Sequence, residues 1–201
     1  MSAKPAPLPL SFYARDCLDV APECIGKLLV HDATDGLVAG RIVECEAYRG
    51  PEDQAAHSFG ARRTARTEVM FGPPGRAYMF MLYGSSWALN FVTGREGEPQ
   101  VVLVRALEPA IGVERMAARR RVAPAKREIS NGPGKLCHAL GLDRSFYGAD
   151  LVAGPLYLAD GPAGPIGASS RINIPYAGNW IEKPWRFYER GNRYVSVPPR
   201  I

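Results

Sequence analysis

The sequence predicts an α+β fold, in which one domain contains a largely antiparallel sheet with flanking helices. A chain of 201 residues is long enough for one substantial core and short for two independent domains. It contains 21 Gly and 18 Pro but only 22% charged residues, which favours many short elements joined by tight turns over a helical bundle. Strand-like runs outnumber helical ones and do not alternate with them regularly, which favours antiparallel pairing.

Two short helices are expected near the start of the chain. Residues 1–9 are rich in proline and predict a flexible tail ahead of a single domain over residues 10–201. Ser11 is a candidate cap for the first helix. The second helix is expected to follow Asp19, with Pro22 near its first turn.

Two turn signals predict β-hairpins in the first half of the chain. One is Asp-Gly at residues 35–36, and the other is Gly-Ser-Ser at residues 84–86. The strands that they join are expected at Leu28–His31 with Leu37–Tyr48, and at the aromatic-rich runs Arg76–Tyr83 with Trp87–Thr93.

The second half combines a central strand, two helices and four short strands. Val101–Leu107 is short and mostly apolar, as is typical of a strand at the centre of a sheet. A helical pattern then begins at Glu108 and continues through Arg121. Another helix is expected at Lys135–Leu140, ended by Gly141. The closing strands are expected at about Leu156–Ala159, Arg171–Ile174, Trp185–Glu189 and Tyr194–Val197.

What the sequence lacks excludes several classes of protein. No apolar run approaches the roughly 18 residues of a membrane helix. The proline-interrupted start does not resemble a signal peptide, so we expect a cytoplasmic protein. Four cysteines without C-x-x-C spacing predict free thiols, no disulfide and no structural metal. The common nucleotide-, nucleophile- and zinc-site motifs are missing, which predicts chemistry by water and carboxylate without a cofactor.

Positive charge is concentrated in the second half of the chain. The whole chain has a net charge of +5, but residues 1–100 carry −2 and residues 101–201 carry +7. Such a block favours binding to a polyanion, because each Lys or Arg that replaces a condensed counterion releases that ion into solution, with a gain in entropy. A solvated helix face followed by a basic loop is the alternative, and both interpretations stay open. The block consists of Arg115, Arg119, Arg120, Arg121, Lys126 and Arg127.

The densest candidates for chemistry lie within residues 41–60. On a strand, period 2 places Glu44, Glu46 and Tyr48 on one face. The following turn leads to His57, and a carboxylate with a histidine could activate water. Two alternatives stay open: an ordinary solvated face, and a glycosidase-type acid/base pair of Glu44 and Glu46, whose spacing is permissible.

Aromatic side chains on the second predicted hairpin form another candidate group. Tyr78, Phe80, Tyr83 and Trp87 could stack on nucleobases or pack in the core, since strands favour aromatics. Tyr83 stands apart because it lies next to the turn, where full burial is unfavourable and an aromatic could wedge between bases.

Together, these segments resemble the alkyladenine (3-methyladenine) DNA glycosylase family, the single-domain type with a DNA-intercalating β-hairpin. The resemblance covers nearly the whole chain, from about Leu10 to Val197. It implies a curved sheet with a protruding hairpin. The segments that carry it occur in order as RIVECEAYRGPEDQAAHSFG, MFGPPGRAYMFMLYGSSWALNFV, VLVRALEP, NGPGKLCHALGLD, KPWRFYERGN and YVSV.

The resemblance implies a monofunctional base-excision enzyme without lyase activity. Such an enzyme flips an alkylated or deaminated purine out of duplex DNA and hydrolyses its N-glycosidic bond. The purines include 3-methyladenine, 7-methylguanine, hypoxanthine and ethenoadenine. Glu46 matches the general base that activates water, Arg105 helps to hold that water, and the backbone carbonyl of Ile172 matches a further water contact. In this mapping Glu44 is a neighbour of the general base Glu46, and the two do not form an acid/base pair.

The resemblance also implies roles around the base pocket. Tyr48 and His57 match pocket walls, with His57 also near the DNA backbone. Tyr83 matches the residue that inserts into DNA, and Asn90 one that crowds the exocyclic amine of guanine. Two positions depart from well-studied members: Phe80 replaces a stacking tyrosine, and Ser85 replaces a bulky apolar residue. The DNA-backbone contacts expected among the basic residues are Arg119, Arg120 and Lys135.

The partner implied is double-stranded DNA with damaged purines, bound by a monomer without membrane contact. The protein would be associated with the nucleoid if bacterial. The main alternative is a non-catalytic nucleic-acid-binding module on the same scaffold, which would have no need of Glu46 and Arg105 together. A weaker alternative is a carbohydrate-active hydrolase built on Glu44 and Glu46, which predicts little affinity for DNA.

Overall fold

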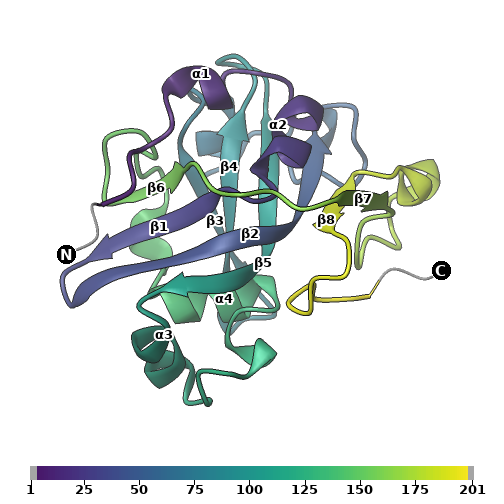
Figure 1. Cartoon of the computed structure of the whole chain (residues 1–201). Helices are drawn as coiled ribbons and strands as arrows, with labels where there is room; N and C mark the ends of the chain where they lie inside the picture. Colours follow the sequence, from purple (N-terminus) through teal and green to yellow (C-terminus); the bar gives the residue numbers. More distant parts are fainter. Residues whose placement is uncertain (1–3, 199–201) are drawn as a thin grey trace.

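The computed structural model describes residues 4–198 as one α+β domain built on a sheet of eight strands. The strand order is β3-β4-β5-β2-β1-β6, with β8 also paired to β2 and β7 to β8, and these pairings are antiparallel (Figure 1). The predicted α+β class is therefore confirmed. The strands are β1 (Leu28–Ala33), β2 (Gly36–Arg49), β3 (Ala77–Leu82), β4 (Ser86–Thr93), β5 (Gln100–Ile111), β6 (Leu156–Ala159), β7 (Ile166–Ser169) and β8 (Arg186–Glu189).

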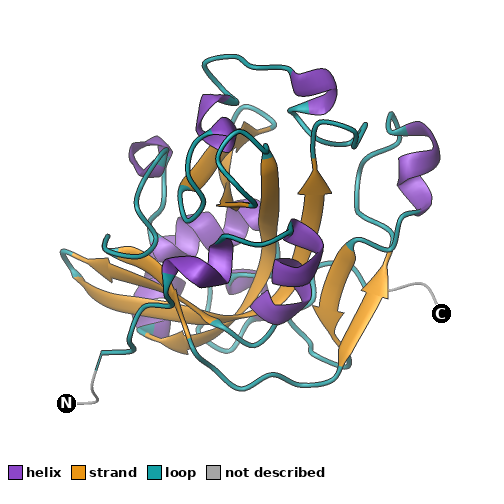
Figure 2. Cartoon of the chain, turned by 90° about the horizontal axis from the view of Figure 1, so that it is seen from above, coloured by secondary structure: helices purple, strands orange, loops and turns teal. Residues whose placement is uncertain are grey.

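Helices cover the sheet and connect its strands. Helix α2 packs against β2, whereas α4 packs against β4 and is covered in turn by α3. Figure 2 shows these helices beside the long strands, with the β7–β8 pair set to one side. The α-helices are α1 (Leu10–Tyr13), α2 (Cys17–Cys24), α3 (Val113–Arg120) and α4 (Pro133–Leu140), and short 3₁₀ segments lie at Phe59–Ala61, Glu68–Phe71, Arg127–Ile129, Arg144–Phe146 and Gly178–Glu182.

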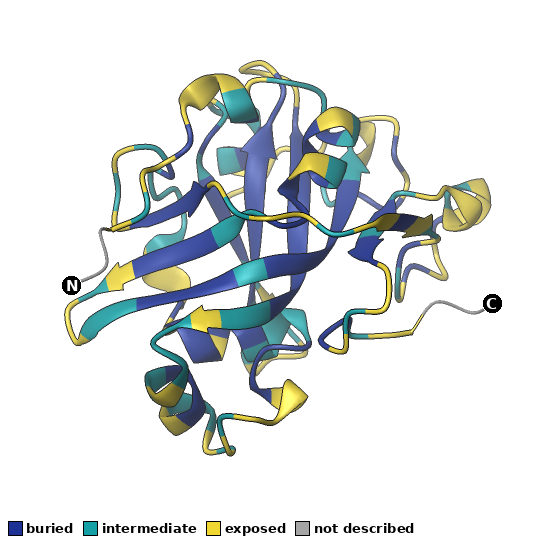
Figure 3. Cartoon of the chain, in the orientation of Figure 1, coloured by how far each residue is buried: buried dark blue, intermediate teal, exposed yellow. Residues whose placement is uncertain are grey.

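The main core lies between the central strands and the helices. Along β2 it takes Val43, Cys45 and Ala47, and these alternate with Glu44 and Glu46 on the other face. The alternation predicted from period 2 is therefore present. Figure 3 shows the central strands buried along most of their length, while the helices expose one side. The four cysteines are buried and free.

Three register shifts interrupt the pairing of β2 with β5, and two of them are adjacent. The register shifts between Ile42 and Glu44 and again between Glu44 and Cys45, so that Val43 and Arg105 have no directly opposed partner. A β-bulge bends a strand and turns side chains in new directions. Here it lies beside the two buried carboxylates of β2.

Both predicted helix starts near the N-terminus are wrong. Helix α2 begins at Cys17 rather than after Asp19, because the Asp16 side chain accepts the N–H of Leu18 at 2.9 Å and caps it. Ser11 lies inside α1 and does not cap it.

Strand β5 is longer than expected, and the helix predicted from Glu108 is displaced. Glu108 still pairs with Arg41 of β2, both in the ladder and through an ion pair, which keeps the chain extended as far as Ile111. Helix α3 therefore begins at Val113. Helix α4 begins at Pro133, two residues before the predicted start, as suits proline in a first turn.

Two predicted strands are absent from residues 4–198. Residues 171–174 form a loop, and Asn173 has φ +59°, outside the strand region. Residues 194–197 also lack a ladder, because the Ser196 amide donates to the Glu44 carboxylate instead. Strand β7 lies earlier, at Ile166–Ser169.

The start of the chain contacts the sheet. Pro7 forms a β-bridge with Ala159, the Leu8 amide donates to the Leu158 carbonyl at 2.7 Å, and Leu8 is buried. The tail predicted over residues 1–9 stays a prediction, and its first three residues lie outside the described part. Among residues 4–198, no helix is long and apolar enough to span a membrane.

Candidate active site

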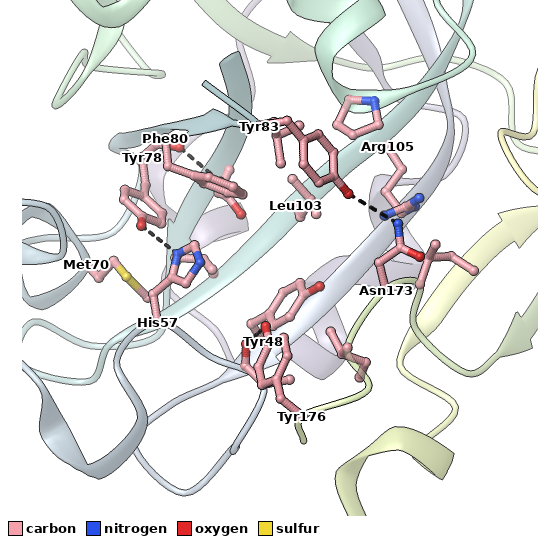
Figure 4. Close-up of a pocket in the computed structure, with 17 residues that line it drawn as sticks. Tyr48, His57, Met70, Tyr78, Phe80, Tyr83, Leu103, Arg105, Asn173 and Tyr176 are labelled. Carbon is pink, nitrogen blue, oxygen red and sulfur yellow. Dashed lines mark hydrogen bonds between the residues drawn. The ribbon is translucent and has the colours of Figure 1, made fainter. Parts of the chain in front are cut away.

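A cavity of about 310 Å³ opens between the β3–β4 hairpin, the β2–β5 pair and the loop over residues 172–176. Figure 4 shows its aromatic and polar side chains converging from these separate elements. Its lining is mostly apolar and aromatic with a few polar groups, as in most small-molecule sites. The lining residues are Tyr48, Ala55, His57, Met70, Tyr78, Phe80, Leu82, Tyr83, Asn90, Val101, Leu103, Arg105, Pro133, Ile172, Asn173, Ile174 and Tyr176.

Glu46 lies directly behind the cavity wall, and its side chain is fully buried. Its Oε1 accepts the backbone N–H of Ile172 at 2.7 Å, and its Oε2 accepts the hydroxyl of Tyr48 at 2.7 Å. Burial, with Glu46 adjacent, raises the pKa of the Tyr48 phenol well above its usual value, so the phenol stays a donor. Each carboxylate oxygen has two lone pairs, so these bonds leave Glu46 able to accept another proton donor.

Arg105 connects Glu46 to a second buried carboxylate. Its Nη1 lies 3.3 Å from Glu46 Oε1, and its Nε donates to Glu44 Oε1 at 2.8 Å. Glu44 also accepts from Arg186 at 2.8 Å and from the Ser196 hydroxyl at 2.9 Å. Burial alone would raise the pKa of the Glu44 carboxyl, but Arg105, Arg186 and Ser196 hold it below its usual value. The two carboxylates and two guanidiniums therefore compensate one another.

One wall of the cavity is a contact between His57, Tyr78 and Phe80. The His57 and Phe80 rings meet edge to face, with centroids 4.7 Å apart. Arg66 Nη2 lies 3.0 Å from His57 Nε2 and 3.4 Å from Nδ1. His57 Nδ1 lies 2.7 Å from the Tyr78 hydroxyl oxygen, so one hydrogen bond joins the imidazole to the phenol. Burial and then Arg66 lower the pKa of His57 to about 4.

Tyr83 stands at the tip of the β3–β4 hairpin and is 85% exposed. Its φ of +48° is unusual for a non-glycine residue, but Tyr83 and Gly84 are the two central residues of the hairpin turn, which the Ser85 N–H closes on the Leu82 carbonyl at 3.1 Å. Across the cavity mouth, the Asn173 side-chain amide donates to the Tyr83 hydroxyl at 3.4 Å, as drawn in Figure 4. The hairpin therefore presents one large aromatic side chain to solvent beside the cavity.

Comparison with known proteins assigns this arrangement to a family. Residues 11–193 match the family model described as methylpurine-DNA glycosylase (MPG). The chain belongs to the methylpurine-DNA glycosylase family. Its members are DNA glycosylases, hydrolases of base-excision repair, and DNA is therefore the macromolecule that this chain binds.

Three similar proteins cover almost the whole chain. A protein of Desulfitobacterium hafniense (strain Y51) is 47% identical over 195 residues, which span 92% of this chain and 96% of that protein. A protein of Methanocella arvoryzae is 48% identical over 191 residues, spanning 94% and 95%. A protein of Bacillus cereus (strain ATCC 14579) is 45% identical over 201 residues, spanning 94% and 98%. Each bears the name "Putative 3-methyladenine DNA glycosylase".

The structure brings together the residues that the family resemblance assigns to the pocket. The buried Asn90 donates its side-chain N–H to the Tyr78 carbonyl at 3.1 Å, which fixes its amide orientation. The resemblance concerned the Ile172 carbonyl, whereas the contact present here is made by its N–H. Of the residues singled out from the sequence, those lining the cavity are Tyr48, His57, Tyr78, Phe80, Tyr83, Asn90, Arg105 and Ile172.

The three residues expected to contact the DNA backbone lie in different places and have different partners. Lys135 lies in the first turn of α4, close to Pro133 at the cavity. Arg119 instead forms an ion pair with Asp35 at 2.7 Å, near the other end of α4, where it also donates to a helix carbonyl. Arg120 donates to the Glu128 carbonyl at 3.3 Å. Of the three, only Lys135 lies within two residues of a cavity-lining residue in the sequence.

Several members of the site carry no local signal in the sequence. Met70, Leu103 and Tyr176 are ordinary apolar or aromatic residues until the fold brings them to the cavity. Arg66 could have been found, because the run ARRTAR at residues 61–66 directly follows the histidine segment. Two further partners of Glu44, Arg186 and Ser196, come from β8 and from the loop after it, far along the chain.

Proposed function

We propose that this protein is a monofunctional DNA glycosylase that excises alkylated or deaminated purines. The substrates would be flipped nucleotides carrying 3-methyladenine, 7-methylguanine, hypoxanthine or ethenoadenine. Support comes from the names of the relatives and from a cavity of about 310 Å³ with aromatic walls. Enzymes that act on a base must take it out of the stack, at a cost of a few kcal/mol that is lowest for weakly paired lesions.

The observation that carries the proposal is the position of Glu46. Its carboxylate is held by the Ile172 N–H and the Tyr48 hydroxyl, beside a guanidinium that lines the cavity. In the proposed reaction, Glu46 takes a proton from water, and the water oxygen attacks C1′ of the flipped nucleotide. The C1′–N bond breaks and its electron pair leaves with the purine, so a cationic alkylated purine departs as the neutral base, while hypoxanthine or ethenoadenine also takes up a proton from solvent. An abasic site remains. The carboxylate also stabilises positive charge that develops on the sugar.

Arg105 would hold the attacking water in line. Its Nε is occupied by Glu44 and its Nη1 lies close to Glu46, so the guanidinium has a fixed orientation at the cavity wall. Among the described residues that line the cavity there is no lysine. Water is therefore the proposed nucleophile, and neither a Schiff base nor strand cleavage is expected.

The aromatic residues would capture the base and fill the gap that it leaves. Tyr48 and Phe80 come from different strands and offer ring faces for stacking, while the buried Asn90 would crowd the exocyclic amine of guanine. Tyr83, exposed at the hairpin tip, would insert between the neighbouring bases. Base–aromatic stacking contributes about 1–3 kcal/mol per base, enough to offset part of the flipping cost.

The proposal is tested by incubating the protein with duplexes that contain one hypoxanthine or one ethenoadenine, and with methylated DNA. We expect free base to be released and strands to break only after alkali, with no adduct trapped by borohydride. Release of no base from any of these duplexes would overturn the proposed activity. Strand breaks before alkali, or a trapped adduct, would contradict the monofunctional mechanism.

A further inference from the structure

A buried ion pair lies beside the site and has no part in the steps above. Arg171 and Asp53 have fully buried side chains. Arg171 Nη2 donates to Asp53 Oδ1 at 2.8 Å, and its Nη1 donates to the other carboxylate oxygen and to the Ala47 carbonyl at 2.9 Å. Replacing such a pair by apolar side chains is often neutral or stabilising, so stability alone gives little reason to bury these charges.

Asp53 is itself held firmly. Its Oδ2 accepts the Arg49 N–H at 3.1 Å and its Oδ1 accepts the Ala55 N–H at 2.9 Å, in the turn that follows β2. Both oxygens therefore have a backbone donor as well as a guanidinium donor. The Asp53 carboxylate is therefore fixed in position, and it binds the Arg171 guanidinium.

Arg171 contacts two parts of the site. Its guanidinium carbon lies 4.7 Å from the centroid of the Tyr48 ring and 5.1 Å from that of Trp185. Arg171 does not line the cavity, so it supports the Tyr48 ring without occupying the space of a base. The next residue, Ile172, donates its N–H to Glu46 at 2.7 Å. One side chain thus supports the stacking wall and the chain segment that holds Glu46, the carboxylate proposed to activate water.

The segment around Arg171 has no other regular support. Strand β7 ends at Ser169, residues 171–174 form a loop, and Asn173 has φ +59°. Without a strand ladder, the Ile172 amide is held through the bonds of the neighbouring Arg171 side chain and through Ile174, which is buried against Ala55 and Ala177.

We propose that Arg171 and Asp53 are positioning residues, which hold the Tyr48 ring and the Ile172 N–H in fixed relation to Glu46. The inference rests on the proposed role of Glu46. The ion pair therefore couples the position of the stacking wall to that of the catalytic carboxylate.

The test uses the full chain with three variants. Arg171→Met with Asp53→Asn removes both charges and keeps a side-chain oxygen for the turn. Arg171→Lys keeps the charge but loses the planar fork. Arg41→Met is the matched control, because Arg41 forms a partly buried ion pair with Glu108 and Glu189 outside the cavity lining. The measurements are the exchange rate of the Ile172 amide by NMR, single-turnover base release, and affinity for undamaged duplex.

In the double variant we expect the Ile172 amide to exchange about tenfold faster or more. Base release should slow by about 10- to 100-fold. Affinity for undamaged duplex should be unchanged. Arg171→Lys should change the amide exchange and the release rate in the same direction but by less, and Arg41→Met should change neither.

A folded double variant with the wild-type amide exchange and release rate would overturn the proposal. If the double variant does not fold, Arg171→Lys decides by the same measurements, and wild-type values there would overturn the proposal. The amide readout does not depend on activity. If the wild-type protein releases no base while the amide changes as expected, the proposed function fails and the positioning role stands.

Discussion

Nη1 of Arg105 lies 3.3 Å from Oε1 of Glu46, and the same guanidinium donates through Nε to Glu44. One side chain thus connects the two buried carboxylates, which lie two residues apart on the same face of β2. Their surroundings differ: Glu44 is enclosed by Arg105, Arg186 and Ser196, whereas the neighbours of Glu46 line the cavity. Glu44 is therefore a structural carboxylate inside the fold, whereas Glu46 is a carboxylate beside the cavity.

Glu44→Gln should destabilise the protein at neutral pH. Removing the charge leaves Arg105 and Arg186 buried with less compensation, which costs about 3–5 kcal/mol when a buried pair is broken. The lowered pKa of Glu44 means that its contribution is present above the unfolded pKa and lost as the pH falls through the folded one. Urea unfolding of wild type and variant should therefore differ at pH 7 and converge in acid. Equal stability at pH 7 would contradict this account.

Tyr83→Ala should impair lesion capture without weakening the fold. The side chain is 85% exposed, so little packing is lost, whereas the loss of one stacking contact costs about 1–3 kcal/mol. We expect lesion excision to fall by about 5- to 150-fold, while affinity for undamaged duplex and Tm stay the same. Met81→Ala, at an exposed position of the same hairpin, is the control. An equal loss of lesion and undamaged-DNA binding would show that Tyr83 is a general contact.

His57 should remain neutral in mildly acidic solution. Burial and Arg66 lower its pKa to about 4, so the folded state binds fewer protons than the unfolded state between that value and about 6.5. Its contribution to stability is therefore present above about pH 6.5 and lost as the pH falls toward 4. NMR titration of the imidazole measures the pKa, and Arg66→Gln should raise it. Titration near 6.5 in the wild type would contradict the buried environment.

Lys135 and Arg119 should differ in their effect on DNA binding. Lys135 lies at the cavity end of α4, while Arg119 is engaged by Asp35. Lys135→Ala should weaken binding to undamaged duplex and reduce the slope of log K against log salt by about 1. Arg119→Ala should leave that slope unchanged. A larger change of slope for Arg119→Ala would reverse the assignment.

Local patterns in the sequence were sufficient for the hairpins and for the faces of β2. The two turn signals place β1–β2 and β3–β4 correctly, because turn chemistry is local. Errors arise where a tertiary contact decides. The Arg41–Glu108 pair extends β5 through residues that have a helical pattern, and the ion pair of Arg171 holds a loop where a strand was expected.

The candidate site was predictable only as far as its residues lie in ordered motifs. Glu46, Tyr48 and His57 fall within one segment, and the family resemblance adds Arg105 and the hairpin. Contacts between distant parts of the chain have no such signal. Ser196 reaches Glu44 across 152 residues, and Arg171 reaches Asp53 across 118. Neither partner is marked by composition, spacing or periodicity.

The role of Glu46 is tested most directly by comparing wild type with Glu46→Gln under single-turnover conditions. The substrate is a duplex with one hypoxanthine or ethenoadenine, and binding to the same duplex is measured in parallel. Glutamine keeps the size of the side chain and an oxygen for the Ile172 N–H, but it cannot take a proton from water. We predict that the variant binds the lesion duplex as the wild type does and releases no base. Release by the variant at the wild-type rate would contradict Glu46 as the general base.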